Sequence, residues 1–146
     1  MTTPTPGQLD AARRLVANPR SRWMPGMRGF MDGLAKYGFR VVAVHAGNAM
    51  CYDESVLAWE NADTDVKPGD IPDPNDPATL GCVLALVREA WNDDSIEFQP
   101  HPRPGYRMRL FSYRDCVPRG YGDTRFEALV SALEAAPVKD TAKETP

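Results

Sequence analysis

Three stretches of the chain place their apolar residues at helical spacing, each behind a residue that can cap a helix. Thr5 precedes the first stretch and can form a capping box with Gln8, and Thr124 precedes the third stretch in the same way. Asp76 precedes the second stretch and is followed by a proline, which the first turn of a helix tolerates. The first helix should end before Pro19, because a proline pushes its predecessor out of the α region. We predict helices over residues 6–18, 77–91 and 125–136.

Gly81 is out of place in the second predicted helix, which is otherwise the most apolar of the three. A glycine inside a helix costs about 1 kcal/mol relative to alanine. A glycine retained at such a cost predicts close approach of another backbone. We therefore expect a neighbouring element to pack closely against Gly81.

The first half of the chain also contains strand patterns. The sequence FRVVAVH, from Phe39 to His45, is rich in β-branched residues and lies between two glycines, which is typical of a strand. Residues 28–31 are its expected hairpin partner. Residues 55–59 could add a short further strand.

The second half predicts a hairpin of residues 96–99 and 106–113 around a proline-rich loop. Successive side chains of a strand point to opposite faces of the sheet. Tyr106, Met108 and Leu110 should therefore share one face, and the other face should carry Arg107, Arg109 and Phe111.

These elements predict an α+β fold in which helices cover a small antiparallel sheet, in the order α-β-β-insert-α-β-β-α. We expect one domain over residues 1–137, because 146 residues can bury a core without disulfides. An acidic insert is expected at about 51–76, where residues 53–76 include eight acidic residues against a single lysine. Residues 138–146 should form a flexible C-terminal tail.

Composition narrows the class of protein. The chain is 42% hydrophobic and 25% charged, which is ordinary for a globular protein, and its net charge of −3 offers no global attraction to nucleic acid or anionic lipid. Three widely spaced cysteines form neither a disulfide framework nor a zinc pair. Without a signal sequence or a transmembrane stretch, we expect a cytoplasmic protein with no membrane contact, in the host cytoplasm if a phage encodes it.

Candidate chemistry is sparse, and we predict no catalytic residue, no metal site and no cofactor. His45 and Cys51 could form a nucleophilic pair, but two isolated histidines are more often structural. We interpret the insert as a solvated acidic loop rather than as a calcium site, because Lys67 and Pro68 stand where an EF-hand needs a ligand and a glycine. Its acids are Asp63, Asp65, Asp70, Asp73 and Asp76.

The basic residues are the asymmetry that could serve binding. Arginines alternate with aromatic residues in the second half of the chain, a combination that many sheet surfaces use to hold phosphates and stack bases. The alternative is that these arginines simply form the solvent face of a strand. The candidate residues for binding nucleic acid or a partner are Arg103, Arg107, Arg109, Tyr113, Arg114 and Arg119.

Three segments carry a resemblance to a known family: residues 22–27 (RWMPGM), 76–91 (DPATLGCVLALVREAW) and 122–137 (GDTRFEALVSALEAAP). Together they resemble the phage ABA sandwich domain of small bacteriophage and prophage proteins. The resemblance implies a small sheet held between helices and no particular activity, and residues 51–74 depart from the pattern. It favours a non-enzymatic phage accessory protein that binds a host or phage macromolecule. The alternatives are a nucleic-acid-binding module using the arginine and aromatic face and, less favoured, a small hydrolase or nuclease using the acidic insert.

Overall fold

The computed structural model describes residues 3–33, 38–45, 48–53, 64–100 and 108–138. Several predictions concern residues outside this part of the chain. They are the strand at 55–59, the loop that carries Arg103 and Arg107, and the tail beyond Val138.

All three predicted helices are present: α1 (Pro6–Ala17), α2 (Pro77–Trp91) and α3 (Arg125–Ala135). The capping box at Thr5 is complete, because its hydroxyl accepts from the Gln8 N–H while the Gln8 side chain accepts from the Thr5 N–H. Asp76 caps α2 by accepting from the Thr79 N–H at 3.0 Å. Local capping signals therefore located the helix starts correctly.

The strands form two antiparallel sheets rather than the single sheet that the sequence suggested. The first sheet has the strand order β4-β3-β2-β1-β5, and the second has the order β6-β7-β8. The strands of the first sheet are β1 (Arg28–Phe30), β2 (Gly38–His45), β3 (Asn48–Asp53), β4 (Thr64–Asp65) and β5 (Ile71–Pro72). The strands of the second sheet are β6 (Ile96–Gln99), β7 (Met108–Ser112) and β8 (Val117–Gly122). A short 3-10 helix, η1 (Met31–Gly33), follows β1.

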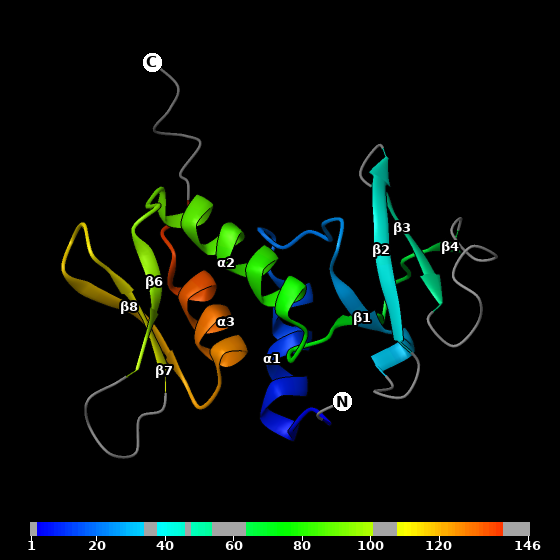
Figure 1. The fold of residues 1–146 in the computed structure, drawn as a ribbon, viewed down its shortest axis with the longest axis horizontal. Helices are drawn as coiled ribbons and strands as arrows, with labels where there is room; N and C mark the ends of the chain where they lie inside the picture. Colours follow the sequence, from blue (N-terminus) through cyan, green and yellow to red (C-terminus); the bar gives the residue numbers. More distant parts are fainter. Residues whose placement is uncertain (1–2, 34–37, 46–47, 54–63, 101–107, 139–146) are drawn as a thin grey trace.

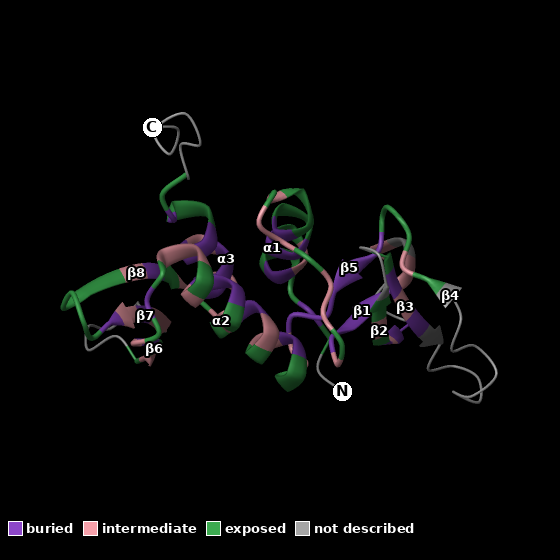
Figure 2. Cartoon of the chain, turned by 90° about the horizontal axis from the view of Figure 1, so that it is seen from above, coloured by how far each residue is buried: buried purple, intermediate pink, exposed green. Residues whose placement is uncertain are grey.

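The helices lie between the two sheets, as Figures 1 and 2 show from two directions. Helix α3 packs on β7 and β8, and α1 packs between α3 and β5. The α+β class with antiparallel sheets covered by helices is thus confirmed. Its layer order, however, places helices between sheets, which the sequence did not predict.

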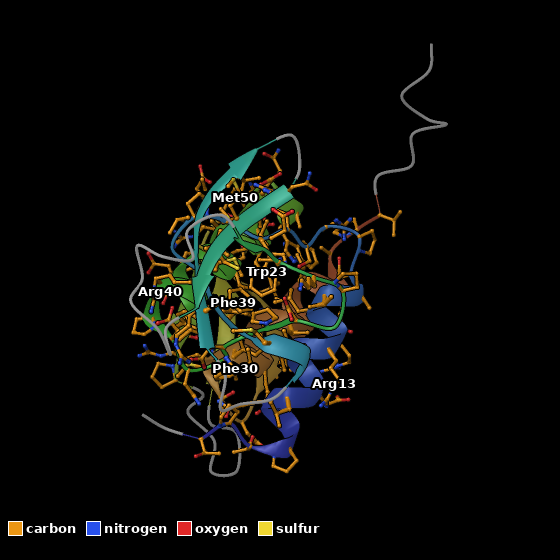
Figure 3. All side chains as sticks on the ribbon, turned by 90° about the vertical axis from the view of Figure 1, so that its right-hand side faces the viewer. Arg13, Trp23, Phe30, Phe39, Arg40 and Met50 are labelled. Atoms are coloured by element: carbon orange, nitrogen blue, oxygen red, sulfur yellow. The ribbon has the colours of Figure 1, made fainter. Side chains whose placement is uncertain are left out.

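The first sheet contributes buried apolar residues to the core. Phe39 and Val41 on β2 are almost fully buried, and the ring of Phe39 lies 5.3 Å from that of Trp23 (Figure 3). Phe30 from β1 stands opposite Ile71 from β5, so both lie on the other face of this sheet, where they are also buried. The expected pairing of residues 28–31 with the strand that begins near Phe39 is confirmed, with Gly29 opposite Phe39.

The described residues of the acidic insert, 51–53 and 64–76, include strand segments and buried acids. The insert contains the end of β3 and all of β4 and β5, and Asp70 and Asp73 are both about 5% exposed. The prediction of a solvated loop is therefore wrong for these two acids. Asp73 forms an ion pair with the equally buried Arg28, whose Nη1 lies 2.6 Å from the Asp73 Oδ2. This pairing explains how the buried charge of Asp73 is accommodated.

Gly81 does not have the close neighbour that its position suggested. It is exposed, and a Cβ built there would meet nothing within 4 Å. The close approach lies in β8 instead, where a Cβ on Gly120 would come within 2.6 Å of the Ala128 carbonyl oxygen and the Ala132 nitrogen. The glycines of β8 allow α3 to lie directly on the second sheet.

Candidate nucleic-acid interface

The second sheet has one covered face and one open face. Ile96 and Leu110 are fully buried beneath α2 and α3. Figures 1 and 2 show no described helix or strand on the opposite side of this sheet. We call that side the outer face, and it carries Glu97, Gln99, Arg109, Phe111, Tyr113 and Tyr121.

Strand register explains why these residues meet. Arg109 on the central strand stands opposite Gln99 of β6 on one side and opposite Tyr121 of β8 on the other. Phe111 follows two residues later on the same face and stands opposite Glu97. The alternation predicted for Met108 to Phe111 is confirmed, since Leu110 is buried while Arg109 and Phe111 are half-buried.

Arg109 is held by two neighbours. Its Nε donates to the Gln99 Oε1 at 2.6 Å, and its guanidinium lies 5.0 Å from the centre of the Phe111 ring. Within the described part of the chain, its two terminal nitrogens make no hydrogen bond or ion pair. They remain free to donate to a ligand.

Two tyrosine rings flank this arginine. Tyr113 packs edge-on against Phe111 with ring centroids 5.1 Å apart, and its hydroxyl accepts from the Gln99 Nε2 at 3.3 Å. Tyr113 is 49% exposed and Tyr121 is 43% exposed. An open sheet face with exposed rings beside an oriented arginine is suited to hold planar ligands.

The other described candidate arginines make different contacts. Arg114 donates to the Asn92 carbonyl at 2.8 Å and lies 3.5 Å from Asp115. Arg119 stacks 4.2 Å over Trp91 and pairs with Asp115 at 2.5 Å. Their charges are therefore largely used within the molecule. Of the six candidates, the structure brings together Arg109 and Tyr113, while Arg103 and Arg107 lie outside the described residues.

Asp93 is a buried carboxylate close to this sheet, and its role is structural. It accepts hydrogen bonds from the Ser112 hydroxyl and from the Ser95 hydroxyl and N–H. Burial alone would raise the pKa of Asp93, but these hydrogen bonds, helped by Arg114, lower it to about 2. The carboxylate stays ionised, and its hydrogen bonds connect the turn between α2 and β6 to the end of β7.

Three of the described acids of the insert, Asp70, Asp73 and Asp76, have partners within the fold. Arg40 pairs with Asp76 at 3.1 Å, which helps to lower the pKa of Asp76 despite the opposing effect of burial. Asp70 accepts from the Lys67 N–H, and Asp65 is exposed. Within the described ranges, no group of three side chains is arranged to hold a metal ion. Asp63 and the ring of His45 lie outside what the structure describes.

The three cysteines all lie within the described residues and form no disulfide. Cys51 is buried in the first sheet and Cys116 is exposed in the turn before β8. Burial and the nearby carboxylate of Asp76 raise the pKa of the half-buried Cys82 thiol, so that it is a poor nucleophile at neutral pH.

A hollow of about 370 Å³ lies between α2 and the segment after α1. Two arginines stand at its rim, but both are already engaged. Arg20 donates to the carbonyls of Ala136 and Pro137, and Arg22 pairs with Glu89 at 2.8 Å. This hollow offers a weaker case for a ligand than the outer face.

Sequence reasoning missed the contribution of Gln99 to the outer face and, although it counted Tyr121 among the aromatic residues near the arginines, it could not place that ring. Strand β8 was not predicted, because its sequence VPRGYG contains a proline and two glycines, which weaken a strand signal. Without β8, the position of Tyr121 opposite Arg109 could not be derived. A rule for cross-strand neighbours would have found Gln99 once the register of β6 and β7 was known.

No described helix is long and apolar enough to cross a membrane. Comparison of the chain with protein-family models, with curated proteins and with solved structures finds no match.

Proposed function

We propose that this protein is a non-enzymatic binding protein that holds single-stranded nucleic acid on the outer face of its second sheet. The observation that carries the proposal is Arg109, oriented by Gln99 and Phe111 with its terminal nitrogens unused, beside the exposed rings of Tyr113 and Tyr121. Aromatic rings offer stacking platforms to bases, and guanidinium groups supply hydrogen bonds and charge.

The distribution of charge supports an anionic ligand such as nucleic acid over a neutral or cationic one. Six arginines lie between Ile96 and Phe126 against three acidic residues, although the whole chain has a net charge of −3. The segment that forms the second sheet is thus locally positive. Because the rest of the chain is acidic, long-range attraction is weak, and we expect micromolar affinity at best.

The resemblance to small phage proteins suggests the setting in which such binding would act. We propose a phage accessory protein in the cytoplasm of the infected host. This part of the proposal rests on the sequence segments 76–91 and 122–137 and on no residue of the outer face.

The test measures binding of labelled single-stranded DNA and RNA of about 12 nucleotides. Fluorescence anisotropy reports the binding at about 50 mM salt and above. We expect affinity to fall with salt with a log-log slope of roughly 0.7 per phosphate neutralised. Tyr113→Ala should weaken binding by about 1–3 kcal/mol, whereas Tyr113→Phe keeps the ring and should bind nearly as the wild type does.

A control variant tests whether the loss of any positive charge weakens binding. Arg14→Ala serves this purpose, because it removes an exposed arginine from α1, away from the outer face. It should leave binding unchanged. Absence of binding to either nucleic acid at the lowest salt would exclude this function and leave a protein partner as the remaining candidate.

A further inference from the structure

The neighbours of Arg109 fix the orientation of its guanidinium and leave its two terminal nitrogens as hydrogen-bond donors. A guanidinium has five N–H groups, and the Nε–H of Arg109 is taken by Gln99 while Phe111 covers one side of the plane. Gln99 is fixed in turn, because its amide nitrogen donates to the Tyr113 hydroxyl at 3.3 Å. The N–H groups of the two terminal nitrogens are therefore presented together for a ligand that offers two acceptors in one plane.

Two kinds of acceptor pair fit this fork within a nucleic acid: the oxygens of a phosphate, and the O6 and N7 atoms of guanine. The neighbouring charge distinguishes between them. Glu97 is on the same face, diagonal to Arg109 across β6 and β7, and its side chain is 63% exposed. The contact of Glu97 with Arg88 is long, at 3.9 Å, and exposed, so that it neutralises the carboxylate only weakly.

A carboxylate about 7–8 Å away along the diagonal repels a phosphate, which carries a full negative charge, more strongly than the uncharged edge of a base. The flanking rings act in the same direction, because a base that stacks on Tyr113 or Tyr121 brings its edge to the level of the sheet surface near Arg109. We propose that Arg109 recognises guanine, donating to O6 and N7 of a base in the bound single strand. The inference rests on the proposed function and names the base that the outer face prefers.

The experiment compares thymidine oligonucleotides of about 12 nucleotides that differ only at one central position, which holds guanine, 7-deazaguanine, adenine or cytosine. A single guanine avoids structures formed by guanine runs. We expect the guanine strand to bind about fivefold to hundredfold more tightly than the adenine strand, the range of one bidentate contact. The 7-deazaguanine strand lacks the N7 acceptor and should lose most of that advantage.

Two variants assign the preference to Arg109. Arg109→Lys keeps the charge but not the fork, so it should bind all four strands with similar affinity. Arg125→Lys is the matched control, since Arg125 stacks on Phe98 on the covered side of the sheet and should leave the preference for guanine intact. Circular dichroism of each variant establishes that it is folded.

The outcomes separate the two proposals. Equal binding of all four strands by the wild type, with Tyr113→Ala still weakening it, would overturn the guanine contact and leave nucleic-acid binding in place. A uniform loss of affinity in Arg109→Lys, with no change in base preference, would show a phosphate contact instead and also overturn it. No binding of any strand would overturn the proposed function itself.

Discussion

Asp93 illustrates how one buried carboxylate fixes a junction between elements. It follows Asn92, which ends α2 in the left-handed conformation at a φ of 49°, and its oxygens collect the donors of Ser95 and Ser112. A carboxylate with several hydrogen bonds to its charged form is easier to ionise than in the unfolded chain. The turn is thus stabilised by a charge that is present only when Asp93 is deprotonated.

This coupling predicts a pH dependence of stability. The pKa of Asp93 is lowered from 3.8 to about 2 on folding, so its contribution is complete above about pH 4 and is lost as the pH falls toward 2. Ser112→Ala removes a donor to the carboxylate and should lower the free energy of unfolding at pH 7 by about 1.5–3 kcal/mol. Urea unfolding at pH 7 and at pH 2.5 measures the difference between variant and wild type, which should shrink at the lower pH.

Ser131→Ala, on α3, is the control for that experiment and should show no such change with pH. A difference between Ser112→Ala and wild type that is the same at both pH values would contradict the assignment to Asp93.

At the scale of elements, the glycines of α2 and β8 have opposite surroundings. Gly81 stands on an exposed side of α2 with open space around it, whereas Gly120 lies directly beneath the backbone of α3. Gly81→Ala should therefore stabilise the protein by about 1 kcal/mol through helix propensity alone. Gly120→Ala should destabilise it by at least about 1–3 kcal/mol, because its Cβ would overlap Ala128 and Ala132.

Denaturant midpoints of the two variants, measured beside wild type, decide this prediction. If Gly81→Ala were destabilising, a neighbour would have to lie against α2 there, as the sequence suggested. If Gly120→Ala were neutral, α3 would have to sit further from the second sheet than described.

Helices were predicted well from the sequence because their signals are local. Thr5, Asp76 and Thr124 each cap a helix within three residues of themselves, and no distant contact is needed to see it. Strands β3 and β8 were missed for the converse reason. The sequence NAMCYD of β3 contains no β-branched residue. The glycines of β8 are explained by the close packing of α3 against them, and that contact involves another part of the chain.

The same distinction applies to the candidate site. The sequence could place Arg109 and Phe111 on one face by alternation, since a period of two residues is local. It could not show that Arg114 and Arg119 share Asp115, or that Gln99 orients Arg109, because these contacts depend on turns and strand register.

At the scale of the whole molecule, the buried ion pair between Arg28 and Asp73 lies within the first sheet, where β1 meets the start of α2. Both side chains are 7% exposed, and the N–H of Arg28 donates to the hydroxyl of Thr79 at the start of α2. Helix α2 in turn packs on α3, which covers the second sheet. A change at this pair should therefore be felt at both ends of the molecule.

Asp73→Ala removes the carboxylate that pairs with the buried guanidinium of Arg28, which should cost up to about 3–5 kcal/mol of stability. Because the three helices serve both sheets, we expect this loss to shift one cooperative transition rather than to unfold the first sheet alone. Trp23, beside Phe39 of the first sheet, and Trp91, which donates to the Ala132 carbonyl of α3, report on the two ends. With Trp59 replaced by phenylalanine and either Trp23 or Trp91 replaced as well, the fluorescence midpoint of each protein should coincide with its own circular-dichroism midpoint, and Asp73→Ala should lower the midpoints in both proteins. Loss of the Trp23 signal before the circular-dichroism signal would mean that the first sheet unfolds independently of the helices and that the ion pair stabilises only its own end of the fold.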